Sequence, residues 1–316
     1  MNKIKVGFIG TGYMATEYAK VFKKIKKPKI KLIGAINKSG LNIDKFLNLH
    51  KIKGKFETID QLMIKTKPDL LVVAVNELSM LSVMKTISNY PCVALIEKPL
   101  GINFEENRKI ISLNKNRNFH AFLGMNRRKY SSVISAQKLL KLDSSRRIIT
   151  INDQENTSKA IEGGQPKRVV KNWMYANSIH MIDFCKIFGR GKVQKIIKMS
   201  EKNFLKENFL SRKLIYSSGD VIYYNCLWNR PGPWSLSIST KKFYLELKPI
   251  EKLRYISSQN RIWQEFPISK EDKIFKPGLY LQIKQLINFI KLKKSNLENI
   301  KKSSDLMKLI KDIYFG

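Results

Sequence analysis

The chain has 316 residues, of which 43% are hydrophobic, and its 60 lysines and arginines against 25 aspartates and glutamates give a net charge of +35. This length and hydrophobic content suit a folded protein of two domains and exclude a disordered one. Because no apolar run reaches the roughly 18 to 20 residues that span a bilayer, and the first expected strand starts at the N-terminus without a leader, we expect a cytoplasmic protein without membrane association.

The positive charge raises the question of nucleic-acid binding. The lysines are spread through all the expected helices and loops, which indicates a biased composition rather than a stripe directed at phosphates. The four tryptophans do not alternate with a basic run as base-stacking aromatics would. We therefore expect only weak, sequence-independent and salt-dependent nucleic-acid binding, although the field still attracts anionic small molecules.

Cysteines and histidines show neither a disulfide nor a metal pattern. Cys92, Cys185 and Cys226 are far apart in the chain, and none belongs to a Cys-x-x-Cys pair. The three histidines lack the spacing of zinc ligands. We expect three buried thiols, no disulfide framework and a metal-free site.

A glycine-rich turn near the N-terminus is the first functional motif. An apolar strand at residues 6–9 is followed by Gly10-Thr11-Gly12-Tyr13-Met14-Ala15, a helix at 14–22 and a second strand at 30–37. Gly10 permits the tight turn, Gly12 lets the backbone approach a pyrophosphate, and Ala15 lets the helix pack on the strand. This context predicts a dinucleotide-binding turn, with an ordinary strand-to-helix turn as the alternative.

The pattern of alternating strands and helices continues to residue 124. The strand at 69–75 is a continuous apolar run, as expected for a parallel strand covered on both faces. The further strands are expected at 54–57, 93–97 and 120–124, and the helices at 43–48, 59–65, 79–88 and 104–114. Residues 1–124 are therefore predicted to form a doubly wound parallel-sheet (Rossmann) domain that binds a dinucleotide at the strand ends.

Residues 125–316 are predicted to form a second, α+β domain that binds substrate and mediates oligomerisation. Alternating apolar and polar residues indicate a mostly antiparallel sheet with one covered face. The strands are expected at 147–153, 193–200, 213–217, 221–228, 234–239 and 243–248, and the helices at 132–142, 178–188, 279–292 and 304–313.

The end of the second strand bears on cofactor choice. An acidic residue there usually binds the ribose 2′-hydroxyl of NAD and would repel the 2′-phosphate of NADP. This chain has Asn37, followed by Lys38 and Ser39, which could supply a charge and a hydroxyl to that phosphate. We therefore expect a preference for NADP, with NAD possible; a solvated loop that discriminates little is the alternative.

Lys98 and His180 are the candidate catalytic side chains. Lys98 follows a strand within Glu97-Lys98-Pro99, and the proline favours an extended backbone that directs the lysine out of the strand end. His180 lies near the start of an amphipathic helix, three residues before Asp183, whose carboxylate could orient the imidazole. A surface turn and a half-buried structural histidine are the alternatives.

These features together resemble the glucose-fructose oxidoreductase/inositol dehydrogenase (Gfo/Idh/MocA) family of NAD(P)-dependent sugar and cyclitol dehydrogenases. The resemblance covers essentially the whole chain and rests on the glycine turn, Glu97-Lys98-Pro99, Asn126-Arg127-Arg128, His180-x-x-Asp183 and Pro277-Gly278-Leu279-Tyr280-x-Gln282. It implies that Lys98 is a hydrogen-bonding catalytic lysine and His180 the acid/base residue. It also implies a homodimer or homotetramer built on the open face of the second-domain sheet.

Two positions depart from the family pattern. Members often carry an aspartate four residues before the histidine, where this chain has Ala176 with Tyr175 and Asn177 as polar neighbours. The loop after the fourth strand keeps only Asn76 of a pattern that often contains Thr-Pro-Asn-x-x-His. Tyr175 is a fallback acid if Ala176 has shifted the roles.

We therefore expect an NAD(P)-dependent oxidoreductase that moves a hydride between nicotinamide and a carbinol or ketone carbon of a sugar, such as a nucleotide-linked sugar in saccharide biosynthesis. A degenerate member that binds a dinucleotide or sugar as a regulator, without turnover, is the alternative. The expected cofactor contacts are Gly10, Thr11, Gly12, Tyr13, Met14, Asn37, Lys38, Ser39, Asn76, Glu97 and Lys98. The expected supporting residues around the two catalytic ones are Tyr175, Asn177, Asp183, Asn126 and Arg127.

Overall fold

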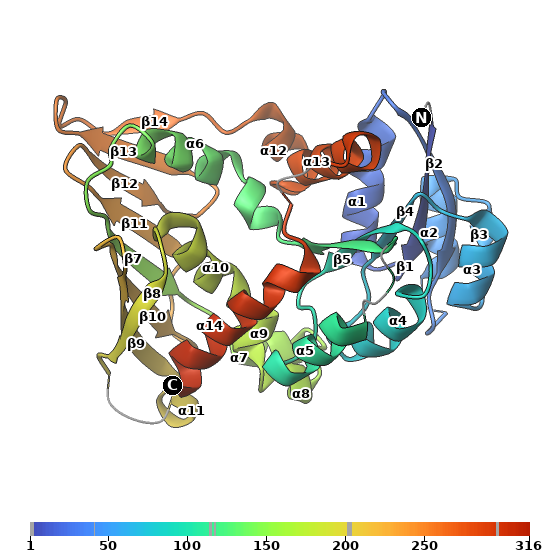
Figure 1. The fold of residues 1–316 in the computed structure, drawn as a ribbon, viewed down its shortest axis with the longest axis horizontal. Helices are drawn as coiled ribbons and strands as arrows, with labels where there is room; N and C mark the ends of the chain where they lie inside the picture. Colours follow the sequence, from blue (N-terminus) through green and yellow to red (C-terminus); the bar gives the residue numbers. More distant parts are fainter. Residues whose placement is uncertain (1–2, 41, 114–115, 117, 201–203, 295–296) are drawn as a thin grey trace. The chain divides into compact units, whose positions relative to one another are not determined.

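The structure, a computed structural model, describes residues 3–40, 42–113, 116, 118–200, 204–294 and 297–316 (Figure 1). Contacts between Cα atoms divide the chain into two compact units. The first unit consists of Met1–Asn126 and Ile274–Ser304, and the second of Arg127–Lys273 and Asp305–Gly316. Among the described residues, no helix is both long and apolar enough to cross a membrane.

A six-stranded parallel sheet forms the centre of the first unit, which confirms the predicted Rossmann fold. Its strands are β1 (Lys3–Ile9), β2 (Lys29–Ile36), β3 (Gly54–Lys55), β4 (Leu70–Val73), β5 (Val93–Glu97) and β6 (His120–Gly124), in the order β3-β2-β1-β4-β5-β6. All four residues of β4 are buried, as their continuous apolar run predicts. The strand order reverses between β1 and β4, which is where ligands of doubly wound sheets bind.

The helices of the first unit follow the predicted positions closely. They are α1 (Tyr13–Lys24), α2 (Ile43–His50), α3 (Ile59–Thr66), α4 (Met80–Ile87), α5 (Phe104–Leu113), α13 (Leu279–Leu292) and the short η1 (Glu77–Ser79) and η3 (Ile300–Lys302). Thr58 begins α3 by accepting a hydrogen bond from the backbone N–H of Gln61, a typical N-cap. Residue 114, the expected end of α5, lies outside the described residues.

Helix α13 belongs to the first unit, although the sequence places all of residues 125–316 in the second domain. Its buried residues Leu279, Ile283 and Leu286 share one hydrophobic cluster with Tyr18 and Phe22 of α1. Burial of this apolar face against α1 brings the chain back to the first unit after Ile274. The functions assigned to the two domains stay predictions.

An eight-stranded, mostly antiparallel sheet forms the centre of the second unit, as predicted. Its order is β14-β13-β12-β11-β7-β10-β9-β8, and β7 pairs with β10 in parallel. The strands are β7 (Ile148–Asp153), β8 (Val193–Lys198), β9 (Phe209–Tyr216), β10 (Val221–Leu227), β11 (Ser235–Ser239), β12 (Phe243–Leu247), β13 (Leu253–Ser257) and β14 (Gln264–Phe266). The last two strands were not expected from the sequence.

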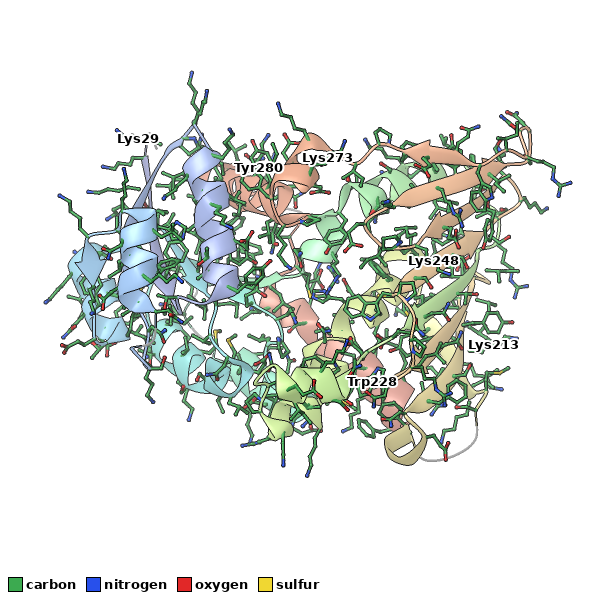
Figure 2. The ribbon with its side chains drawn as sticks, turned by 180° about the vertical axis from the view of Figure 1, so that it is seen from behind. Lys29, Lys213, Trp228, Lys248, Lys273 and Tyr280 are labelled. Atoms are coloured by element: carbon green, nitrogen blue, oxygen red, sulfur yellow. The ribbon has the colours of Figure 1, made fainter. Side chains whose placement is uncertain are left out.

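Helices α6 (Ser131–Leu140), α10 (Ile179–Phe188) and α14 (Ser303–Phe315) lie on one side of this sheet (Figure 1). Residues alternate between the two faces, so Ile151 and Asp153 of β7 are buried while Asn152 is only partly so. Figure 2 shows Lys213 of β9 on the side away from the helices. Five short helices were not expected from the sequence, namely α7 (Thr157–Glu162), α8 (Lys167–Val170), α9 (Trp173–Ala176), α11 (Phe204–Glu207) and α12 (Lys270–Ile274).

Candidate active site

A pocket of about 680 Å³ lies at the carboxyl ends of β1, β2 and β4 in the first unit. The structure therefore gathers residues of the glycine turn and of the two strand ends around one hollow. Seven predicted cofactor residues line this hollow, namely Gly10, Thr11, Gly12, Asn37, Lys38, Ser39 and Asn76. Four other predicted contacts, Tyr13, Met14, Glu97 and Lys98, do not line it.

The glycine turn has the geometry that a pyrophosphate requires. Gly10 has φ +91°, and a Cβ added there would lie 2.1 Å from the carbonyl oxygen of Ala74, so only glycine fits. A Cβ added at Gly12 would meet no described heavy atom within 4 Å, which leaves the backbone open to a ligand. Gly12 also begins α1, and the described first turn of this helix contains no acidic residue. A phosphate group therefore fits the N-terminus of α1.

Asn37 is held in place at the end of β2. Its Nδ2 donates to Thr11 Oγ1 at 2.9 Å, and its Oδ1 accepts from the backbone N–H and the hydroxyl of Ser39 at 3.3 and 3.1 Å. Lys38 and Ser39 are exposed beside it. Glu57 also lines the hollow, so the loop around the predicted ribose position is not uniformly basic.

Glu97 and Lys98 lie at the end of β5 with different environments. Glu97 is buried, and Tyr18 of α1 donates to its Oε1 at 2.5 Å. Burial raises the pKa of the Glu97 carboxyl, and the Tyr18 hydrogen bond and Lys98 oppose this rise. Lys98, the next residue, is half-buried and is joined to Pro99 by a cis peptide bond. Glu97 thus ties the strand end to α1, which fixes the backbone that carries Lys98.

In the second unit, His180 is the second residue of α10 and is buried. Its backbone N–H donates to the carbonyl oxygen of Asn177 at 3.2 Å. Tyr175 and Ala176 are buried in α9, immediately before Asn177. The structure therefore brings His180 and its predicted supporting residues Tyr175 and Asn177 into one short segment.

Asp183 has a partner that the sequence analysis did not assign. Both of its carboxylate oxygens accept hydrogen bonds from the guanidinium group of Arg128, and the Asp183 side chain is only 2% exposed. Arg128 follows Arg127, whose guanidinium lies 4.2 Å from the centroid of the Trp234 ring. The ion pair holds α10 one turn after His180, so the Asp183 carboxylate helps to fix the position of this helix.

Asn126, the other predicted supporting residue, lies in the first unit. Its Nδ2 donates to the carbonyl oxygen of Pro277 at 3.0 Å. This bond ties the end of β6 to the segment that leads into α13.

Two buried acids at the end of β7 were missed. Glu155 accepts from Trp173 Nε1 at 2.9 Å and from Asn177 Nδ2, which lies 3.0 Å from each carboxylate oxygen. Asp153 accepts from the Tyr224 hydroxyl at 2.6 Å. Burial raises the pKa of both carboxyl groups, and Asp153 raises that of Glu155 further. The strand alternation places Asp153 on the helix-covered face, but nothing local predicts which groups meet it.

Comparison with known proteins agrees with the geometry of the first unit. Residues 4–124 match the model of an oxidoreductase family with an NAD-binding Rossmann fold, Gfo/Idh/MocA. The matched residues contain the glycine turn and all six strands of the parallel sheet. The match confirms the resemblance found in the sequence and the prediction of an oxidoreductase with a dinucleotide-binding fold. No curated protein matches the sequence.

Solved structures of similar fold cover nearly the whole chain. The UDP-N-acetylglucosamine 3-dehydrogenase GnnA from Acidithiobacillus ferrooxidans has a TM-score of 0.79 and 14% identity, over 99% of this chain and 97% of that one. A dehydrogenase from Chromobacterium violaceum has a TM-score of 0.80 and 15% identity, over 99% and 95%. The WlbA dehydrogenase from Bordetella pertussis, in complex with NADH and UDP-GlcNAcA, has a TM-score of 0.78 and 12% identity, over 99% and 95%. At these identities the likeness shows the fold alone.

Proposed function

We propose that this chain is an NADP(H)-dependent oxidoreductase that acts on a hydroxyl-bearing carbon of a nucleotide-linked sugar. The observation that carries the proposal is the 680 Å³ hollow at the carboxyl ends of β1, β2 and β4, into which the glycine turn opens. The open backbone at Gly12 suits a pyrophosphate, and the neutral Asn37 beside Lys38 and Ser39 suits a 2′-phosphate.

A bound nicotinamide would accept or return the hydride. Side chains of the protein must then remove or return the proton of the hydroxyl group while negative charge develops on its oxygen. We assign to Lys98 a hydrogen bond to that oxygen and to His180 the exchange of the proton. Tyr175 is the fallback acid, because position 176 is an alanine.

Two observations favour a nucleotide-linked sugar as substrate. GnnA is named as a UDP-N-acetylglucosamine dehydrogenase, and WlbA is described in complex with a UDP-sugar and NADH. The net charge of +35 also favours an anionic substrate, since such a field raises its local concentration.

The test combines binding with turnover. NADPH and NADH are titrated by their fluorescence, and a panel of UDP-, GDP- and dTDP-sugars is then screened for cofactor oxidation or reduction. We expect tighter binding of NADPH and turnover of a nucleotide sugar. Sugar or dinucleotide binding without turnover of any compound would instead support a regulatory binding protein, the alternative that Ala176 keeps open.

Variants of the two proposed catalytic residues test the mechanism. Loss of a positioned acid/base group costs about 100-fold to 10,000-fold in rate. We expect Lys98→Ala and His180→Ala each to lose at least the smaller factor in kcat, with little change in NADPH affinity. Normal turnover by His180→Ala alone would move the proton transfer to Tyr175 or Lys98, and normal turnover by both would refute the mechanism.

We also propose a homodimer or homotetramer formed through the uncovered face of the second unit's sheet. This face carries a hydrogen-bonded row in which Ser211 donates to Asn225, Asn225 to Asn152 and Asn152 to Ser235. Protein interfaces carry hydrogen bonds as well as apolar contacts, so a polar row of this kind is compatible with such an interface. Light scattering at several protein concentrations measures the state, and a monomer at all concentrations would refute the proposal.

A further inference from the structure

Glu155 lies at a junction between β7 and the segment that carries His180. Its carboxylate receives hydrogen bonds from the first residue of α9, Trp173, and from Asn177, which follows the last residue of α9. The residue is only 8% exposed. One buried side chain therefore contacts both ends of a helical turn, and Asn177 is the residue that joins this turn to α10.

The backbone of Glu155 is anchored as firmly as its side chain. The N–H of Asn229, beyond the end of β10, donates to the carbonyl oxygen of Glu155 at 2.7 Å. The side chain of Asn229 in turn accepts from the N–H and hydroxyl of Thr157 at 2.9 and 3.0 Å. The Glu155 side chain thus projects from a backbone segment that hydrogen bonds tie to the residues after β10.

A short path leads from Glu155 to His180. Asn177 binds Glu155 through its amide nitrogen, and its carbonyl oxygen accepts the backbone N–H of His180 at 3.2 Å. The Arg128–Asp183 ion pair fixes the same helix three residues later. The first turn of α10 is therefore held at one end by Glu155 through Asn177 and at the other by the Arg128–Asp183 ion pair.

We infer that Glu155 is a positioning residue for the proposed reaction, because its carboxylate holds Asn177 and Trp173 and so fixes where α10 begins and where His180 is placed. The inference rests on the proposed role of His180 as the acid/base group. A buried carboxyl group is costly unless its oxygens accept hydrogen bonds, and those of Glu155 accept them from Trp173 and Asn177. The neighbouring Asp153 raises that cost, because burial and the charge of Asp153 both raise the pKa of the Glu155 carboxyl.

The test uses Glu155→Gln, which keeps the size of the side chain but cannot accept hydrogen bonds at both terminal atoms. We expect kcat to fall by about tenfold to 100-fold, since small displacements of a reacting group have effects of this size. NADPH affinity should not change, because the predicted cofactor residues that line the hollow belong to the first unit. Glu162 is an exposed glutamate on α7, so Glu162→Gln is the matched control. Its kcat and its NADPH affinity should equal those of the wild type.

Histidine NMR gives a readout that does not depend on turnover. The chain has three histidines, so ¹⁵N-labelled imidazoles give a simple spectrum in which His50 and His120 of the first unit serve as internal references. We expect Glu155→Gln to shift the resonances and the titration midpoint of His180 and to leave the other two unchanged. Trp173→Phe removes a single donor and should give a smaller shift of the same kind.

The outcomes separate the two proposals. A lower melting temperature with unchanged kcat and unchanged His180 resonances would show a purely structural role and overturn the inference. If Glu155→Gln does not fold, the His180 resonances of Trp173→Phe decide, and their identity with wild type would equally overturn it. A folded wild type that converts no sugar would count against the proposed function, while the NMR comparison still decides whether Glu155 positions His180.

Discussion

Replacing Asn37 by aspartate is the sharpest test of the predicted cofactor preference. The change is nearly isosteric, and an aspartate could still accept both hydrogen bonds from Ser39. The Thr11 hydroxyl, which now accepts from the amide at 2.9 Å, can rotate to donate instead. The local structure should therefore persist, and the variant adds one negative charge at the end of β2.

The size of the effect follows from charge and exposure. Two unit charges about 4 Å apart interact by about 1 kcal/mol in water and by about 4 kcal/mol at an effective dielectric constant near 20. Asn37 is half-buried and Lys38 and Ser39 are exposed, so the value for water is the better guide. A 2′-phosphate carries a charge of about −1.5 to −2, so we expect NADPH binding to weaken by about 2 kcal/mol, or roughly thirtyfold.

NADH should bind at least as well to this variant, because a carboxylate can accept a hydrogen bond from a ribose 2′-hydroxyl. Fluorescence titration of both cofactors measures the ratio of their dissociation constants. Asn118→Asp is the charge-matched control, since residue 118 precedes β6 and lies at the opposite edge of the parallel sheet. An unchanged NADPH-to-NADH ratio in Asn37→Asp would show that the 2′-phosphate is recognised elsewhere, or not at all.

Two further predictions concern stability. Arg128→Met leaves the buried Asp183 carboxylate without its ion-pair partner, so the free energy of unfolding measured in urea should fall by about 3 kcal/mol. Adding Asp183→Asn to the same chain should restore part of this loss. Full stability of Arg128→Met would contradict this. Burial and the nearby lysines lower the pKa of His50 to about 4 in the folded protein, below its usual 6.5, so the unfolded chain binds more protons between these values. Stability should therefore fall as pH drops from 6.5 towards 4. The melting temperature of His50→Gln should fall less than that of the wild type over the same range.

The positions of most strands in both sheets were predictable because each of these strands carries its own signal. The buried run of β4 and the alternation in β7 and β10 report covered faces directly. β14 has three residues, too few to show a period, and β13 was missed beside it. The place of α13 was also not predictable, because an amphipathic helix reveals that it has an apolar face but not which core receives that face.

The candidate site also has a part that the sequence could predict and a part that it could not. The residues of the glycine turn are consecutive, and their function depends on local backbone geometry such as the positive φ of Gly10. The contacts of Arg128 with Asp183 join residues 55 positions apart, and those of Glu155 with Asn177 join residues 22 apart. Pairings of this kind arise from packing of the whole unit, so the sequence could identify the acids only as residue types.

The distribution of charge explains why the acidic residues are the informative ones in this chain. Lysine and arginine outnumber aspartate and glutamate by 60 to 25, yet among the described residues seven aspartates and glutamates are buried, against one arginine and no lysine. The excess of positive charge therefore lies mainly on solvated surface, where a substitution costs little free energy. A buried carboxylate is costly unless it is bonded, as Glu97 is to Tyr18 and Glu155 is to Asn177. Both of these acids fix the segment that carries a proposed catalytic residue, so in a chain of such biased composition a buried acid is a better guide to the site than any basic cluster.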